Sequence, residues 1–345
     1  MSFAATTRRR SAETALVSVR GLTKRFPVDR DVFGRPSSWL SAVEDVDLEI
    51  FPGETLALVG ESGSGKSTLG RLILRLLPAT SGTVVFDGVD VLSASPAQLR
   101  EFRRNAQIVF QDPFASLDPR LKVDAIVAEG MGHLGLGRKE RRRRVGELLD
   151  LVHLPPASID RFPHEFSGGQ RQRISIARAL AVGARFLVAD EPVSALDVSV
   201  QSHVLNLLID LRERLELTYL FVSHDMSVVS HVADRVAVMY LGKIVEVAPT
   251  EELFANPRHP YTQALLSSVP ALLRGAIDER IRLEGDIPSP VDPPEACRFA
   301  GRCFRTLDVC REQVPTLERL QGDAEHYVAC FNQAPLHGGN GRAGG

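Results

Sequence analysis

The nine residues GESGSGKST, at positions 60–68, carry the strongest structural signal in the chain. They satisfy the pattern G-x-x-x-x-G-K-[ST], in which glycines allow consecutive backbone N–H groups to turn around phosphate oxygens. A short apolar run, TLALV at 55–59, precedes them, and leucines at helical spacing follow them. Phosphate binding requires this order of strand, loop and helix, so the sequence predicts a nucleotide site here.

The polar residues of this loop have expected roles. Lys66 should reach the β and γ phosphates, and Ser67 should ligate Mg²⁺. The N-terminus of the following helix adds its own attraction for anions. The residues expected to contact the nucleotide are Gly60, Ser62, Gly63, Gly65, Lys66, Ser67 and Thr68. The alternative is a chance glycine-rich turn, which matches this pattern in on the order of 1 chain in 100.

Three more short apolar runs have the pattern of buried strands: QIVF at 107–110, FLVA at 186–189 and YLFV at 219–222. Amphipathic helical patterns separate several of the predicted strands, which favours an α/β fold with a mainly parallel sheet covered by helices. Between residues 111 and 173 the strand pattern gives way to a helical one, so we expect a helical insertion there.

Polar side chains follow these predicted strands at their carboxyl ends, where open α/β sheets bind ligands. Asp190 should hold Mg²⁺ through water, and Glu191 is the candidate general base or water-positioning group. Gln111 and His224 occupy similar positions, although each on its own could be an ordinary loop residue.

A second glycine-rich turn, FSGGQRQR at 166–173, precedes another helical pattern. Ser167, Gly168 and Gly169 can present a hydroxyl, backbone N–H groups and a helix N-terminus to a γ-phosphate. Because residues 60–68 already form a phosphate loop, two anion sites imply either two ligands or two copies of the chain.

The order GESGSGKST, Gln111, FSGGQ, VADEP, SALD and His224 resembles the nucleotide-binding subunit of ABC transporters over roughly residues 16–250. The resemblance implies an α/β fold with a P-loop NTPase (RecA-like) core, an antiparallel β subdomain and an inserted α-helical subdomain at about 112–175. It also implies a head-to-tail dimer, in which the Ser-Gly-Gly turn of one protomer closes over ATP bound by the other. Both anion sites then serve one nucleotide, and hydrolysis releases the dimer.

The resemblance assigns further roles to single residues. It implies that Gln111 senses Mg²⁺ and the attacking water, that His224 contacts the γ-phosphate and that Asp197 communicates across the dimer interface. Gln170 joins the Ser-Gly-Gly turn as a nucleotide-binding residue.

One further match concerns the adenine base. Phe26 corresponds to the aromatic residue that stacks on adenine in this family. Phe33 and Trp39 remain alternatives, because the loop that begins at Pro27 could bring either ring to the base.

Several strings narrow the resemblance to the oligopeptide, dipeptide and nickel uptake branch: FQDPFASLDPR, FPHEFSGGQRQR, RHPYTQALLSSVP and LEGDIPSPVDPPEACRF. GRLILRLLPATSGTVVFDG is closest to the second of the two paired ATPase subunits. The branch implies ATP-driven uptake of di- or oligopeptides or related solutes, at the cytoplasmic face of the cell membrane. It implies as partners a second homologous ATPase, two transmembrane permeases and an extracytoplasmic solute-binding protein. The rival is a soluble ABC ATPase of the DNA-repair or translation type.

All four cysteines lie in one segment, spaced Cys297-x5-Cys303-x6-Cys310-x19-Cys330. Four thiols in a Pro-broken stretch suggest a shared ion or cluster, because such a segment has little apolar core to hold it together. The resemblance implies a [4Fe-4S] cluster, for which four thiolates are suitable ligands. Zinc, or reduced thiols without a metal, remain alternatives.

Composition limits the remaining possibilities. The 345 residues carry a formal net charge of −2, which disfavours nucleic acid as a partner. No apolar run is long enough to span a bilayer. We expect a flexible tail at 1–15, an ATPase domain at 16–254, a C-terminal extension with the four cysteines at 255–332 and a disordered tail at 333–345.

Overall fold

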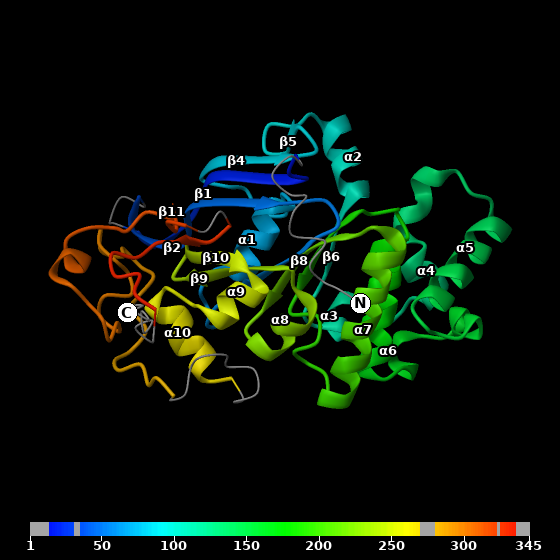
Figure 1. The fold of residues 1–345 in the computed structure, drawn as a ribbon. Helices are drawn as coiled ribbons and strands as arrows, with labels where there is room; N and C mark the ends of the chain where they lie inside the picture. Colours follow the sequence, from blue (N-terminus) through cyan, green and yellow to red (C-terminus); the bar gives the residue numbers. More distant parts are fainter. Residues whose placement is uncertain (1–13, 31–34, 270–279, 323–324, 336–345) are drawn as a thin grey trace. The chain divides into compact units, whose positions relative to one another are not determined.

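The computed structural model describes residues 14–30, 35–269, 280–322 and 325–335 (Figure 1). Most of the two expected tails therefore lies outside the described residues. The chain forms two compact units, each assembled from separate stretches of sequence. Of the described residues, the first unit comprises 14–17, 49–54 and 85–222, and the second comprises 18–30, 35–48, 55–84, 223–269, 280–322 and 325–335.

A mixed sheet lies at the centre of the second unit. Its strands are Thr55–Val59 (β3), Arg235–Tyr240 (β9), Lys243–Pro249 (β10), Glu318–Arg319 (β11) and Tyr327–Val328 (β12). β3 and β9 pair in parallel, whereas β9–β10, β10–β12 and β12–β11 pair antiparallel. Every residue of β3 and β9 is buried, as expected for strands covered on both faces.

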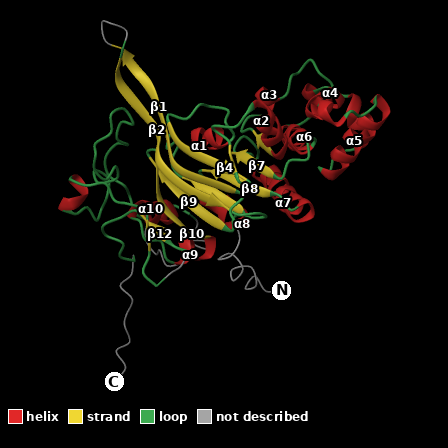
Figure 2. Ribbon diagram, turned by 90° about the horizontal axis from the view of Figure 1, so that it is seen from above, coloured by secondary structure: helices red, strands yellow, loops and turns green. Residues whose placement is uncertain are grey.

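A second sheet contains three neighbouring strands, most of whose residues belong to the same unit. In spatial order they are Pro36–Ile50 (β2), Val17–Arg30 (β1) and Ser81–Phe86 (β4). Figure 2 shows β1 and β2 running side by side. In the first unit, the last residues of β4 pair antiparallel with Val89–Asp90 (β5).

The helices of the second unit are Lys66–Ile73 (α1), Met226–Val232 (α8), Thr250–Ala255 (α9) and Pro260–Ser267 (α10). α1 begins inside the GESGSGKST loop, as its pattern predicts. Its apolar side chains Leu69, Leu72 and Ile73 are buried, so the helix is anchored by the face that its sequence spacing indicates.

Three parallel strands organise the first unit: Ala106–Val109 (β6), Phe186–Asp190 (β7) and Thr218–Ser223 (β8), with β7 in the middle. Residues at their carboxyl ends share one register, since Val109 lies opposite Ala189 and Asp190 lies opposite Val222. Pro96–Asn105 (α2) and Val198–Leu215 (α7) are the helices next to these strands in the chain. The expected α/β fold is confirmed.

The region between β6 and β7 is helical. It contains the helices Pro113–Ser116 (α3), Val123–Val127 (α4), Arg138–Leu151 (α5) and Gly168–Leu180 (α6), together with short 3₁₀ turns at Glu129–Leu134, Pro156–Asp160 and Pro163–Glu165. Figure 2 shows α4, α5 and α6 gathered into one group. The helical pattern in the sequence therefore corresponds to an inserted group of helices.

The C-terminal extension has more apolar core than the sequence suggests. Tyr261, Leu266 and Phe299 are buried in the same cluster as Val236 and Tyr240 of β9. Within the cysteine segment itself, Phe299 belongs to this cluster and Cys297 and Cys303 pack against it, so that segment has more apolar contact than we expected. Among the described residues, no helix is long and apolar enough to cross a membrane.

Candidate functional site

The backbone of the GESGSGKST loop admits only glycine at two positions. Gly60 has φ +155°, and a Cβ there would lie 2.1 Å from the carbonyl oxygen of Met239. Gly65 has φ +106°, and a Cβ there would lie 2.1 Å from the carbonyl oxygen of Ala42. Both contacts are too close for any side chain, so the pattern of glycines follows from the packing of the loop against β2 and β9.

Lys66 is held across this loop. Its side chain is buried, and its Nζ donates hydrogen bonds to the carbonyl oxygens of Gly60 at 2.8 Å and Glu61 at 2.9 Å. Ser64 Oγ lies at 3.5 Å. The ammonium is therefore positioned by oxygen atoms of the loop, where phosphate oxygens can take over its hydrogen bonds.

Two of the predicted catalytic residues meet in the first unit. Nε2 of Gln111 donates a hydrogen bond to Oε2 of Glu191 at 2.9 Å, although 80 residues separate them. Asp190 is buried at the end of β7, and Glu191 follows with φ +47° and its N–H donating to Val222 O at 3.0 Å. The structure thus places an amide beside the candidate base.

The FSGGQ turn forms the N-terminus of α6. The Ser167 hydroxyl accepts from the Gln170 N–H at 3.4 Å, and the Gln170 side chain accepts from the Ser167 N–H at 3.0 Å. A Cβ at Gly169 would lie 2.3 Å from Val200 Cγ1 of α7. The turn is therefore a reciprocal cap on a helix whose first turn packs closely on α7.

The remaining predicted residues lie on the surface or partly buried. His224 is exposed between β8 and α8, and Asp197 is exposed at the N-cap position of α7. Phe26 is half-buried in β1, with Lys24 Nζ 4.8 Å from its ring centroid, while Trp39 in β2 is 40% exposed. Phe33 lies outside the described residues.

Site residues are distributed over both units. The phosphate loop, Phe26, His224 and the four cysteines belong to the second unit, whereas Gln111, Asp190, Glu191, Asp197 and residues 167–170 belong to the first. Each group is thus built by a different set of elements.

Comparison with known proteins identifies the family. Residues 43–194 match the family model described as "ABC transporter", and residues 245–310 match "Oligopeptide/dipeptide transporter, C-terminal region". A Brucella ovis relative named for peptide import is 51% identical over 92% of this chain and 98% of its own length. The chain belongs to the ATP-binding subunits of ABC transporters.

Other relatives of this ABC subunit agree. The oligopeptide transport ATP-binding protein AppF of Bacillus subtilis is 49% identical, and the dipeptide transport ATP-binding protein DppF of Haemophilus influenzae is 47% identical. Each match covers 92% of this chain and 97% of the relative.

Solved ABC cassettes have the same fold. The structure of cbiO1 from Clostridium perfringens matches with a TM-score of 0.61 and 29% sequence identity. The match covers 70% of this chain and 92% of the cbiO1 chain. A dimeric MJ0796 cassette bound to ADP and Pi has a TM-score of 0.60 and 29% identity, covering 68% and 98%.

Contacts that the sequence does not reveal join the C-terminal extension of this ABC subunit to its phosphate loop. Arg302 donates two hydrogen bonds to the Glu61 carboxylate, at 2.9 and 3.2 Å. Tyr261 Oη accepts from the Glu61 N–H at 2.8 Å. No pattern in the sequence connects residue 61 with positions 200 and 241 residues later.

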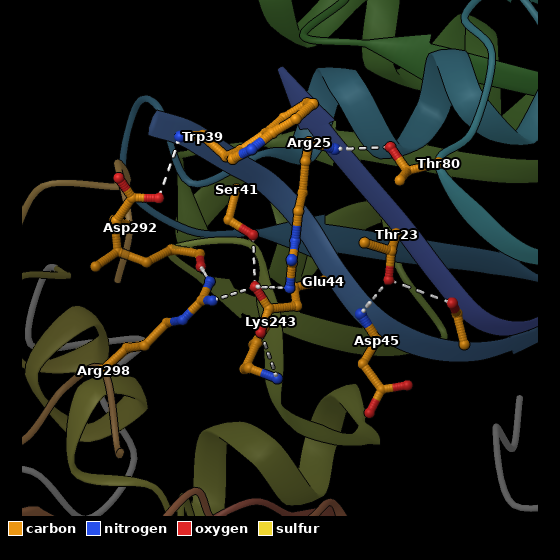
Figure 3. A network of polar contacts seen from close by, with 12 residues as sticks. Thr23, Arg25, Trp39, Ser41, Glu44, Asp45, Thr80, Lys243, Asp292 and Arg298 are labelled. Carbon is orange, nitrogen blue, oxygen red and sulfur yellow. Dashed lines mark hydrogen bonds and ion pairs between the residues drawn. The ribbon is translucent and has the colours of Figure 1, made fainter. Parts of the chain in front are cut away.

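A second polar network holds the extension against β2 (Figure 3). Asp292 accepts from the Trp39 N–H at 3.1 Å and donates its own N–H to Trp39 O at 2.9 Å. The Glu44 carboxylate accepts from Ser41 and Arg298. Although burial opposes it, these contacts hold the pKa of Glu44 below its ordinary value.

All four cysteines are free thiols. Burial raises the pKa of Cys330 to about 12, with smaller contributions from Cys303, Cys297 and Cys310. Cys297 N–H also donates to Cys310 O at 3.1 Å. Within the part of the chain that the structure describes, however, no group of three or more His, Cys, Asp or Glu residues is arranged to hold a metal ion. The expected iron–sulfur cluster therefore has no support from this arrangement.

Proposed function

We propose that this ABC ATPase energises the import of di- or oligopeptides through ATP-dependent head-to-tail dimerisation. The observation that carries the proposal is the combination of an ATPase cassette with a C-terminal region of the oligopeptide/dipeptide type in one chain. Relatives that align over 92% of the chain carry the names of oligopeptide and dipeptide transport ATP-binding proteins. The rival non-transport ATPase has no comparable support.

The phosphate loop would bind the nucleotide, with Lys66 on the β and γ phosphates. Ser67 and Asp190 are assigned to Mg²⁺, for which hydroxyl and carboxylate oxygens are suitable ligands. The metal would neutralise charge on the phosphates. Glu191, oriented by its hydrogen bond from Gln111, would position or deprotonate the attacking water.

The FSGGQ turn supports the dimer. Ser167, Gly168 and Gly169 form the N-terminus of a 13-residue helix, which favours an anion. We assign this turn to the γ-phosphate of ATP bound by the partner, with Gln170 bracing the turn, and assign His224 and Asp197 to the same closed state. The MJ0796 cassette solved with ADP and Pi is likewise a dimer.

The assignment to Glu191 is tested by Glu191→Gln. ATP binding should persist while hydrolysis falls by roughly 100-fold or more, as expected for loss of a general base. An ATP-dependent dimer should accumulate in size-exclusion chromatography. Glu213→Gln makes the same charge change at an exposed position on α7 and should leave hydrolysis unchanged. Hydrolysis at the normal rate in Glu191→Gln would disprove the role.

The transport assignment is tested by isolating the protein from native membranes in mild detergent and identifying its companions by mass spectrometry. We expect a second related ATPase, two permeases and an extracytoplasmic solute-binding protein, with this subunit bound peripherally at the cytoplasmic face. Recovery with ribosomal or DNA-associated proteins would overturn the importer and leave the ATPase intact.

We retain the four-cysteine segment as a candidate centre for a [4Fe-4S] cluster. Four thiolates are a suitable donor set for such a cluster, although no group of three or more His, Cys, Asp or Glu residues in the described part of the chain is arranged to hold a metal ion. Iron, sulfide and zinc should be assayed after anaerobic purification, with Cys330→Ser as the comparison. Stoichiometric iron and sulfide that are lost in the variant would support the cluster; zinc alone, or no metal, would reject it.

A further inference from the structure

Glu61 is the second residue of the phosphate loop, and each of its polar groups is engaged. Its carbonyl oxygen accepts from Lys66 Nζ at 2.9 Å, and its N–H donates to Tyr261 Oη at 2.8 Å. Its carboxylate is paired with both terminal nitrogens of Arg302. One residue therefore links the loop lysine to two side chains of the C-terminal extension.

The groups that hold Glu61 are themselves fixed by packing. Tyr261 lies on α10 and is fully buried, with its ring 4.7 Å from Tyr240 and 5.5 Å from Phe299 between centroids. The Arg302 side chain is only 9% exposed and donates to Tyr240 Oη at 3.4 Å. An ion pair anchored in an aromatic cluster keeps one geometry, unlike the mobile pairs typical of protein surfaces.

The charge of Glu61 is unfavourable for the task of the loop. A carboxylate near phosphate oxygens repels the nucleotide, and more strongly where solvent is partly excluded. Arg302 neutralises this carboxylate with a two-pronged contact and keeps it turned toward the extension. Loss of Arg302 would leave the negative charge of Glu61 unneutralised, and the Glu61 side chain would no longer be held toward the extension.

We propose that Arg302 is a positioning residue for ATP binding. Together with Tyr261, it makes ATP binding at the phosphate loop depend on the C-terminal extension. The proposal rests on the assignment of residues 60–68 as the phosphate loop. In this proposal Arg302 acts through Glu61, with which it makes two hydrogen bonds, and not on the reacting atoms themselves.

The test is a double-mutant cycle of Arg302→Gln and Glu61→Gln in the full-length protein. Arg302→Gln should weaken ATP binding by about 5- to 50-fold, which lies within the usual range for coupling between sites. KM for ATP should rise with kcat within about twofold, because Glu191 and Gln111 are untouched. In the Glu61→Gln background, Arg302→Gln should have little further effect, because the charge that it neutralises is already absent.

Two further variants separate this role from general destabilisation. Arg305→Gln removes a neighbouring arginine that donates to Ala334 O and Pro335 O, and it should leave ATP binding unchanged. Arg302→Lys retains the positive charge but cannot contact both carboxylate oxygens with two nitrogens. Its ATP affinity should therefore fall between those of wild type and Arg302→Gln. Circular dichroism and thermal melting check that each variant is folded. If Arg302→Gln does not fold, the comparison of Arg302→Lys with Arg305→Gln decides.

Three outcomes would overturn the proposal: unchanged ATP affinity in Arg302→Gln, effects of the two substitutions that simply multiply, or an equal loss in Arg305→Gln. The variant Lys66→Ala shows whether a negative result comes from the assignment of the phosphate loop or only from the role given to Arg302. If that variant still binds ATP normally, the phosphate loop is misassigned. If it loses ATP while Arg302→Gln binds normally, only the role of Arg302 is rejected.

Discussion

At the scale of single residues, Glu191 shows how backbone geometry positions a chemical group. Its φ of +47° lies in the left-handed region, which costs a non-glycine residue about 1–2 kcal/mol. The bond from its N–H to Val222 O and the bond that its carboxylate accepts from Gln111 hold it there. A strained residue at the end of a buried strand is typical of a functional position.

His259 predicts a pH dependence of stability at this scale. It caps α10 by accepting from the Tyr261 N–H at 3.1 Å, and burial lowers its pKa to about 4, despite the opposing charge of Glu246. The unfolded chain therefore binds a proton between about pH 6.5 and 4 that the folded chain does not. Its contribution to stability is complete above pH 6.5 and should fall by up to about 1.4 kcal/mol per pH unit as pH decreases through that window.

This dependence can be measured by urea unfolding at pH 7, 6 and 5. His259→Asn keeps a side chain that can cap the helix and removes the titrating group, so its free energy of unfolding should change less with pH than that of the wild type. Parallel pH curves for the two proteins would show that His259 is not responsible.

At the scale of elements, the N-termini of α2 and α6 carry the same reciprocal cap. In α2 the Ser95 hydroxyl accepts from the Gln98 N–H at 3.4 Å, and the Gln98 side chain accepts from the Ser95 N–H at 3.0 Å. In α6, Ser167 and Gln170 make the same two hydrogen bonds at the same distances. Local stability therefore cannot explain why α6 alone begins with two glycines. Packing accounts for Gly169, where a Cβ would lie 2.3 Å from Val200 Cγ1. The exposed residue of this turn is Ser167, whose place at the helix N-terminus suits an anion-binding role.

The pair provides a matched experiment. Ser167→Ala and Ser95→Ala should each reduce the free energy of unfolding by about 1 kcal/mol, the usual value of a lost cap. Only Ser167→Ala should also reduce the ATP-dependent dimer, measured by size-exclusion chromatography in a Glu191→Gln background. Equal dimer in both variants would indicate that the Ser167 hydroxyl serves only the helix.

At the scale of the whole molecule, a buried carboxylate joins the C-terminal extension to the sheet of the second unit. Glu246 of β10 is fully buried and accepts from the N–H groups of Arg258 and His259 at 2.7 and 3.0 Å. His326 Nε2 lies 2.7 Å from its Oε1. Burial of an unpartnered carboxylate is costly, so we expect the cassette to require the extension for its stability.

Truncation tests this requirement. A chain ending after Asn256 leaves Glu246 without these three partners and exposes Tyr240, so we expect a lower melting temperature and weaker ATP binding. A chain ending after Pro335 removes only residues outside the described part and serves as the control. Normal melting and ATP affinity in the shorter chain would show that the extension is independent of the cassette.

Features carried by neighbouring residues were predictable from the sequence. The phosphate loop, the buried strands and the cap of α6 each follow from local residue types, such as glycine where φ is positive and a Cβ has no room. Family resemblance then ordered these motifs into one ATPase. The cysteines share one short segment, but the four-thiol metal centre expected from that segment has no support in the arrangement of the described residues.

Contacts across the chain were not predictable in this way. Glu61 and Arg302 lie 241 residues apart, and Glu246 and His326 lie 80 apart. Charged residues are common on every surface, and neither their type nor their spacing shows which two will meet. Their pairing depends on strand order and on aromatic packing beneath them. The residue types therefore predict the ATP chemistry, whereas packing in three dimensions brings the C-terminal extension into contact with the phosphate loop.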